Sequence, residues 1–80
     1  MKSIWYNSER KNVAGIRIRK LRNEQGLTQE QLAIKAQLLG YAITGNAIAK
    51  LEAGTRFIPD YEISIFAEIL STSPEELLKG

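Results

Sequence analysis

Apolar residues recur with helical spacing in five segments of the chain, and glycine, proline or polar residues separate these segments. The first segment runs from Val13 to Gln25, where a period of about 100° per residue gathers one inward-facing stripe. The members of this stripe are Ala14, Ile18, Leu21 and Gln25. Asn12 can cap the start of this helix with its side-chain oxygen, and Gly26 supplies a left-handed stop after it.

The second segment has the clearest start signal in the sequence. Thr28 and Gln31 have the spacing of a capping box, and Leu27 and Leu32 have the spacing of a hydrophobic staple. The helix is predicted to end near Gly40. It is expected to turn four residues inward, namely Leu32, Ala33, Ala36 and Leu39.

A third helix is predicted at about residues 44–53. Thr44 can cap its start, and Gly54 can end it in a left-handed conformation. Ile43 belongs to the short turn that precedes this helix, and we expect its apolar side chain to fill part of the core.

The last two predicted helices begin at proline-containing boundaries. Pro59 breaks the chain, and Asp60 is expected to cap a fourth helix. The apolar stripe of that helix comprises Ile63, Phe66, Ala67 and Leu70. Ser73 is expected to cap a fifth helix, with Pro74 at its first position, and Leu77 and Leu78 are expected to close the core.

These segments predict an all-α fold of five helices in one domain over residues 13–80. Residues 1–12 show no clear period and are interpreted as an N-terminal tail. Val13 and Ile16 lie off the inward stripe of the first helix. The large apolar side chain of Trp5 is therefore expected to pack, either on these two residues or across a dimer interface.

Composition narrows the functional classes. The chain contains no cysteine and no histidine, which excludes disulfides, zinc sites built on those residues and histidine-based catalysis. No nucleophile–base pairing is recognisable, so we expect no enzyme, cofactor, metal or small-molecule substrate. No apolar run approaches the ~18 residues of a membrane span, so no membrane partner is expected. The net charge of +2 favours a nucleic-acid partner only weakly.

Four blocks of sequence carry a more specific signal. They are Leu21-Arg22, the segment GLTQEQLA at 26–33, the segment IAKLEAGTR at 48–56, and SPEELL at 73–78. Together and in this order they resemble the Cro-like, or XRE, helix-turn-helix family. The resemblance implies a five-helix lambda-repressor-like DNA-binding domain, in which the helix at about 44–53 enters the major groove of double-stranded DNA.

The third helix has a narrow polar face that suits this role. With Asn46 at zero on the helical wheel, Ala49, Lys50 and Ala53 fall within about 60° of it, while Ile48 and Leu51 point roughly opposite. Asparagine pairs well with adenine and lysine with guanine. Three residues are therefore expected at the bases: Asn46, Lys50 and Ala49.

The resemblance also implies which residues contact phosphate. Gln29 lies in the first turn of the second helix, and Thr44 and Gly45 lie at the start of the third. Thr55 and Arg56 follow the third helix, beside the expected path of the DNA backbone. Arg22 and Glu52 resemble a family pair that ties the first helix to the end of the third, and this pair is interpreted as structural.

The sequence departs from the family pattern in two places. The stretch 34–51 is about five residues longer than usual, which lengthens the second helix by nearly a turn before the chain resets at Gly40. Gly45 stands where many family members carry a side chain that can reach bases. Both departures indicate weak or loosely specific recognition.

Two functions follow from these patterns. The first is a sequence-preferring DNA-binding transcriptional regulator of bacterial or phage type, cytoplasmic and associated with the nucleoid. It is expected to act as a homodimer, because two reading side chains alone hardly select one genomic site. The alternative is a protein-interaction module, such as an antitoxin-like or anti-repressor partner, that uses the same fold with little DNA binding.

Overall fold

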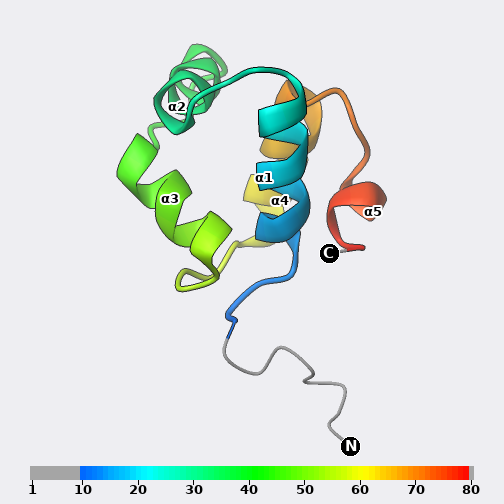
Figure 1. Cartoon of the computed structure of the whole chain (residues 1–80). Helices are drawn as coiled ribbons and strands as arrows, with labels where there is room; N and C mark the ends of the chain where they lie inside the picture. The colour runs from blue at the N-terminus through cyan, green and yellow to red at the C-terminus, as the bar shows by residue number, and fades with distance from the viewer. Residues whose placement is uncertain (1–9, 80) are drawn as a thin grey trace, which may run out of the picture.

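The computed structural model describes residues 10–79, which contain five α-helices and no strand. The helices are α1 Ala14–Glu24, α2 Gln29–Leu38, α3 Gly45–Ala53, α4 Asp60–Ile69 and α5 Pro74–Leu77. Figure 1 shows α2 and α3 on one side of α1 and the short α5 on the other. The predicted all-α, five-helix fold is confirmed. The predicted packing of Trp5 lies outside the described residues.

The core is formed by one cluster of buried apolar side chains to which all five helices contribute. Most of the predicted inward positions are confirmed. They are Ala14, Ile18, Leu32, Ala33, Ala36, Ile43, Ile63, Phe66, Ala67, Leu70 and Leu77, each at most 7% exposed. The outward-facing positions between them leave each helix amphipathic, as the spacing predicted.

Two predicted core residues are exposed instead. Leu39 is 49% and Leu78 is 55% exposed, so both assignments were wrong. Each lies at the C-cap, one residue beyond the last turn of its helix, where the wheel no longer describes the chain. Gln25, the polar end of the α1 stripe, is also exposed, and its Nε2 donates to the Leu70 carbonyl at 2.9 Å.

The predicted helix starts hold in three of the four cases with a threonine, serine or aspartate cap. Thr28 forms the capping box with Gln31, Thr44 accepts from Ala47 N, and Ser73 accepts from Glu76 N. Asp60 does not cap α4, which corrects the prediction. Pro59 occupies the N-cap in an extended conformation, so Asp60 is already the first helical residue.

The end of α2 and the turn at Gly40 lie where the sequence predicted them. The helix continues to Leu38, and Gly40 then adopts the left-handed conformation, with φ +87°. Gly40 N bonds to Gln37 O at 2.9 Å and Tyr41 N bonds to Ala36 O at 3.0 Å. This is the Schellman pattern, which satisfies the last carbonyl groups of α2 and redirects the chain toward α3.

Candidate nucleic-acid interface

Helix α3 shows a polar face to the outside. Asn46, Lys50 and Ala53 are exposed and Ala49 is half-buried. Ile48 and Leu51 are fully buried, so they anchor the opposite face of α3 in the core. The structure therefore places together the three residues that the sequence proposed for base contact, on a face that bulky side chains leave open.

The start of α3 is packed tightly on α2. Gly45 is buried, and a Cβ atom there would come within 2.5 Å of Glu30 Oε1 and 3.4 Å of Glu30 Cα. A side chain at position 45 would therefore point toward α2 rather than outward. The carboxylate of Glu30 also lies beside Gly45, and the phosphate contact expected at this residue stays a prediction.

A buried polar cluster holds α3 against α1 and α2. Arg22 binds Glu52 at two points, with Nε–Oε2 at 2.7 Å and Nη2–Oε1 at 3.0 Å. Arg22 Nη1 also donates to the Leu27 carbonyl at 2.6 Å, and Gln29 Nε2 donates to Glu52 Oε1 at 3.0 Å. The ion pair implied by the family resemblance thus forms. Gln29 uses one of its two amide hydrogens inside the cluster.

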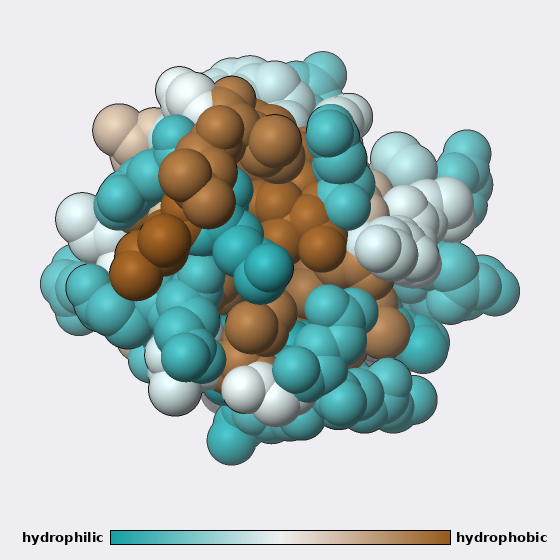
Figure 2. Space-filling view, turned by 90° about the horizontal axis from the view of Figure 1, so that it is seen from above, coloured by the Kyte–Doolittle hydropathy of each residue, from teal (hydrophilic) through white to brown (hydrophobic). Residues whose placement is uncertain are grey.

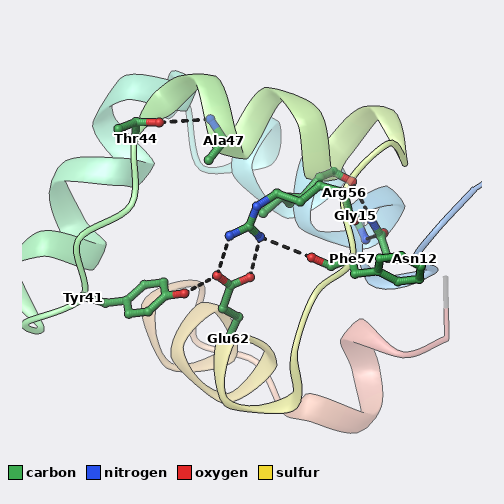
Figure 3. A network of polar contacts seen from close by, with 9 residues as sticks. Asn12, Gly15, Tyr41, Thr44, Ala47, Arg56, Phe57 and Glu62 are labelled. Atoms are coloured by element: carbon green, nitrogen blue, oxygen red, sulfur yellow. Dashed lines mark hydrogen bonds and ion pairs between the residues drawn. The ribbon is translucent and has the colours of Figure 1, made fainter.

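Arg56 is engaged within the protein, not presented as a free cation. Its Nη1 and Nη2 donate to Glu62 Oε1 and Oε2 at 2.7 and 2.9 Å, and Tyr41 Oη donates to the same carboxylate (Figure 3). The Glu62 side chain is fully buried. The structure therefore gives Arg56 an internal structural role, and its predicted phosphate contact stays a prediction.

The ionisation of this network follows from its burial and its hydrogen bonds. Burial raises the pKa of Glu62, but the hydrogen bonds from Arg56 and Tyr41 outweigh it, so this pKa lies below its ordinary value. The hydrogen bond to Glu62 raises the pKa of Arg56. Burial and the same carboxylate raise the pKa of Tyr41 to about 12. At neutral pH the network is therefore one carboxylate between one guanidinium and one neutral phenol.

Residues 10–12, which belong to the predicted tail, close over the end of α3. Lys11 N donates to Gly54 O at 2.7 Å and Arg10 Nη2 donates to Glu52 O at 3.1 Å. Asn12 Nδ2 donates to Leu51 O and Arg56 O, while its Oδ1 accepts from Gly15 N at 2.8 Å. Val13, not Asn12, is the N-cap of α1, which corrects the prediction, but the Asn12 side chain still accepts from an amide of the first turn. The same side chain also satisfies carbonyl groups around the end of α3.

Two hollows flank the polar face of α3, and each carries an exposed cation that sequence reasoning missed. One, of about 520 Å³, is shared by Lys11, Asn46, Lys50 and Thr55, with Lys11 Nζ 5.2 Å from the centre of the Phe57 ring. The other, of about 280 Å³, is bordered by Arg19, Gln29, Ala49 and Ala53. The basic run from Arg17 to Arg22 was the signal that could have indicated Arg19.

The predicted contacts at Thr44 and Thr55 lie at the two ends of α3. Both residues are exposed, and both use their hydroxyl groups locally. Thr44 Oγ1 accepts from Ala47 N at 3.1 Å, and Thr55 Oγ1 donates to Lys50 O at 3.2 Å. Their positions leave them beside the polar face, so a ligand lying along α3 would pass both.

Comparison with known families identifies this arrangement. A family model described as a helix-turn-helix domain matches residues 13–79. The chain belongs to this helix-turn-helix family. No curated protein and no solved structure gave a significant match. In this helix-turn-helix domain α2 and α3 are the paired helices, joined by residues 39–44 instead of the turn of about 3–4 residues that is usual.

Other kinds of site are not evident in the part of the chain from residue 10 to residue 79. No helix there is both long enough and apolar enough to cross a bilayer. No group of three or more acidic, cysteine or histidine residues is arranged to hold a metal ion within the same range. The polar face of α3 and the two hollows beside it bring together most of the polar side chains that the sequence singled out.

Proposed function

We propose that this helix-turn-helix domain is a sequence-preferring, DNA-binding transcriptional regulator that places α3 in the major groove. The observation that carries this proposal is the exposed polar face of α3, with Asn46 and Lys50 one turn apart and the exposed cations Lys11 and Arg19 on either side. Positive charge on both flanks of a groove-sized helix fits two phosphate backbones with base edges between them.

Each side chain has a role that its position supports. Asn46, in the first turn of α3, offers a donor and an acceptor to adenine, and Lys50 reaches guanine or phosphate. The side chains of Ala49 and Ala53 are small and do not protrude from α3, so the helix backbone can approach the bases. Gln29, with its remaining amide hydrogen, is proposed to contact phosphate. Thr44 and Thr55 are proposed to do the same at the two ends of α3.

The domain is proposed to act as a homodimer on two half-sites. One α3 with two reading side chains makes few base contacts, and each good contact is worth only about 1–3 kcal/mol of discrimination. Doubling the contacts through a symmetric dimer is the usual way in which helix-turn-helix proteins reach a useful specificity.

Fluorescence anisotropy over a salt series tests the proposal. A duplex chosen by selection from a random pool is compared with a random duplex. Binding should weaken steeply with salt, with a log–log slope of roughly −3 to −5 per protomer. Asn46→Ala should cost about 1–3 kcal/mol on the selected duplex and little on the random one. Asn23→Ala, which removes an exposed asparagine of α1, is the matched control and should bind as the wild type does.

Two other results would contradict parts of this proposal. Binding that does not depend on salt, or no binding at low salt, would reject the proposal and favour a protein-interaction module. Equal losses on both duplexes for Asn46→Ala would mean that DNA is bound but that this residue does not read sequence.

A further inference from the structure

Hydrophobic side chains gather on the face of the molecule formed by α2 and the last turns of α4. Figure 2, the view from above, shows this apolar area with polar side chains around it. Leu38 is 81% exposed, and Ile34 and Leu39 are each 49% exposed. With the half-buried Ile69 and two charged residues, Lys35 and Glu68, they form a surface that we call the α2–α4 patch.

The end of α2 contributes most of the exposed apolar surface of the patch. Leu38 is the last residue of α2 and Leu39 is its C-cap, and neither fills the core, because both remain exposed. Ile34 and Leu38 are four residues apart, so they share one outward face of the helix. Exposing adjacent large apolar side chains is costly in water, and such patches commonly mark a protein-binding surface.

The charges at the patch make it complementary to itself. Lys35 on α2 and Glu68 on α4 border the same shallow groove, of about 260 Å³, together with Leu38, Leu39 and Ile69. Neither Lys35 nor Glu68 forms an ion pair with any residue in the range 10–79. A two-fold axis through the patch would bring Lys35 of one copy toward the partner's Glu68, and the reverse, around a shared apolar centre.

We propose that the α2–α4 patch is the surface through which two copies of this chain associate. The choice of a second copy as occupant rests on this self-complementary charge and on the proposed function, which calls for a dimer. The patch also leaves the DNA face free. Ile34 is the patch residue closest to the start of α2 and lies five residues from Gln29, so about 8 Å of helix separate the patch from the α2 residue that we propose contacts phosphate.

Charge exchange gives a specific test, with analytical ultracentrifugation as the measurement. The wild-type protein should sediment as a dimer. Lys35→Glu alone and Glu68→Lys alone should each weaken the dimer about tenfold or more, because each places like charges opposite one another at both ends of the interface. An equal mixture of the two variants should restore it, because in the mixed dimer each glutamate faces a lysine. Loss of the dimer in both single variants together with recovery in the mixture is the result expected of an interface that pairs position 35 with the partner's position 68.

Matched variants test the apolar part of the patch. Leu38→Ser should weaken the dimer, whereas Leu78→Ser, at an exposed leucine outside the patch, should not. Melting followed by circular dichroism controls for folding. Because all four changed side chains lie outside the buried core, each variant should still melt as a folded protein. A monomeric wild type, a dimer that tolerates each single charge change, or a mixture that stays monomeric would each overturn the proposal.

DNA binding separates this inference from the proposed function. If both are right, Lys35→Glu weakens binding to a duplex with two half-sites but not to a duplex with one. A second outcome is that the single variants lose the dimer and the mixture regains it, but no variant binds DNA with salt dependence. This outcome would support the interface and reject the DNA-binding function. If DNA binding is salt-dependent but the wild type is monomeric, the proposed interface is rejected and the DNA-binding function is retained.

Discussion

Arg22 of α1 and Glu52 of α3 form a buried two-point ion pair, with side chains only 10% and 3% exposed. Glu52 is also bonded to Gln29, so one carboxylate of α3 joins this helix to both α1 and α2. Because Glu52 lies on the side of α3 away from Asn46, its contacts orient the polar face without occupying it. The orientation of α3 therefore depends on charge pairing as well as on the apolar packing of Ile48 and Leu51.

Removing one member of this pair should destabilise the fold. Glu52→Ala leaves the Arg22 guanidinium buried without its counter-charge, and we expect a loss of about 3 kcal/mol in the free energy of unfolding. The double variant Arg22→Met, Glu52→Leu removes both charges and fills the space with apolar atoms, so it should recover most of that loss. Urea denaturation of the single and double variants measures both values. A double variant that is less stable than Glu52→Ala would show that the pair contributes net stability.

Glu62 should make the protein sensitive to acid. Its pKa is lower in the folded state than in the unfolded state, where it is about 4.3. Its contribution to stability is therefore present above about pH 4.3 and is lost as the pH falls through the folded-state pKa, because protonation then favours the unfolded chain. Glu62→Gln should reduce the difference in unfolding free energy between neutral and acidic pH.

Urea denaturation at several pH values between 7 and about 2 makes this measurement. Glu24→Gln, which removes a carboxylate paired on the surface with Lys20, is the control. If Glu62→Gln keeps the full acid dependence of the wild type, the Arg56–Glu62–Tyr41 network is not its source.

Ser71 is a site where the backbone itself can be improved. It ends α4 with φ +58°, the only non-glycine residue in the range 10–79 with a positive φ, and Thr72 N bonds to Ala67 O at 2.9 Å. This conformation costs an L-residue about 1–2 kcal/mol, and glycine avoids that cost. Glycine also loses more conformational entropy on folding, which cancels part of the gain. Ser71→Gly should therefore stabilise the protein by about 0.5–1 kcal/mol and raise Tm by a few degrees.

The reverse substitution provides the control for Ser71. Gly26 ends α1 with φ +72°, and an added Cβ would meet no atom within 4 Å. Gly26→Ala should therefore lower Tm through the backbone conformation alone. Thermal melting followed by circular dichroism compares the two variants. A lower Tm for Ser71→Gly would mean that the serine side chain contributes more than the backbone conformation costs.

What the sequence could predict depended on the distance between interacting residues. Thr28 with Gln31, and Ser73 with Glu76 N, are contacts three residues apart, so spacing alone was enough to place them. Leu39 was misplaced because a helical wheel was extended past the last turn of the helix. The Arg22–Glu52 pair spans 30 residues and was expected only because of the family resemblance.

Arg56 shows the limit of this reasoning most clearly. It follows a helix that was expected to face DNA, and its type suits phosphate, so the sequence favoured a DNA contact. Its actual partners are Glu62, at the start of the next helix, and through it Tyr41, in the lengthened turn before α3. No period or motif relates these three positions, because they meet only when α4 folds beneath the end of α3.

Arg19 and Arg56 should consequently give opposite results when each is replaced by alanine. Arg19 is exposed beside Gln29 and the polar face of α3, so we propose that it contacts phosphate. Arg19→Ala should flatten the log–log salt slope of DNA binding by about one unit and leave Tm unchanged. Arg56→Ala leaves Glu62 buried without its cation, so it should cost about 2 kcal/mol of stability. The salt slope of Arg56→Ala should match that of the wild type when binding is measured well below the Tm of the variant.

Anisotropy titrations over a salt series, paired with melting curves, measure both quantities for each variant. A flatter slope for a fully folded Arg56→Ala protein would show that this guanidinium leaves Glu62 to bind phosphate, and the division between a structural and a DNA-contacting arginine would then be wrong.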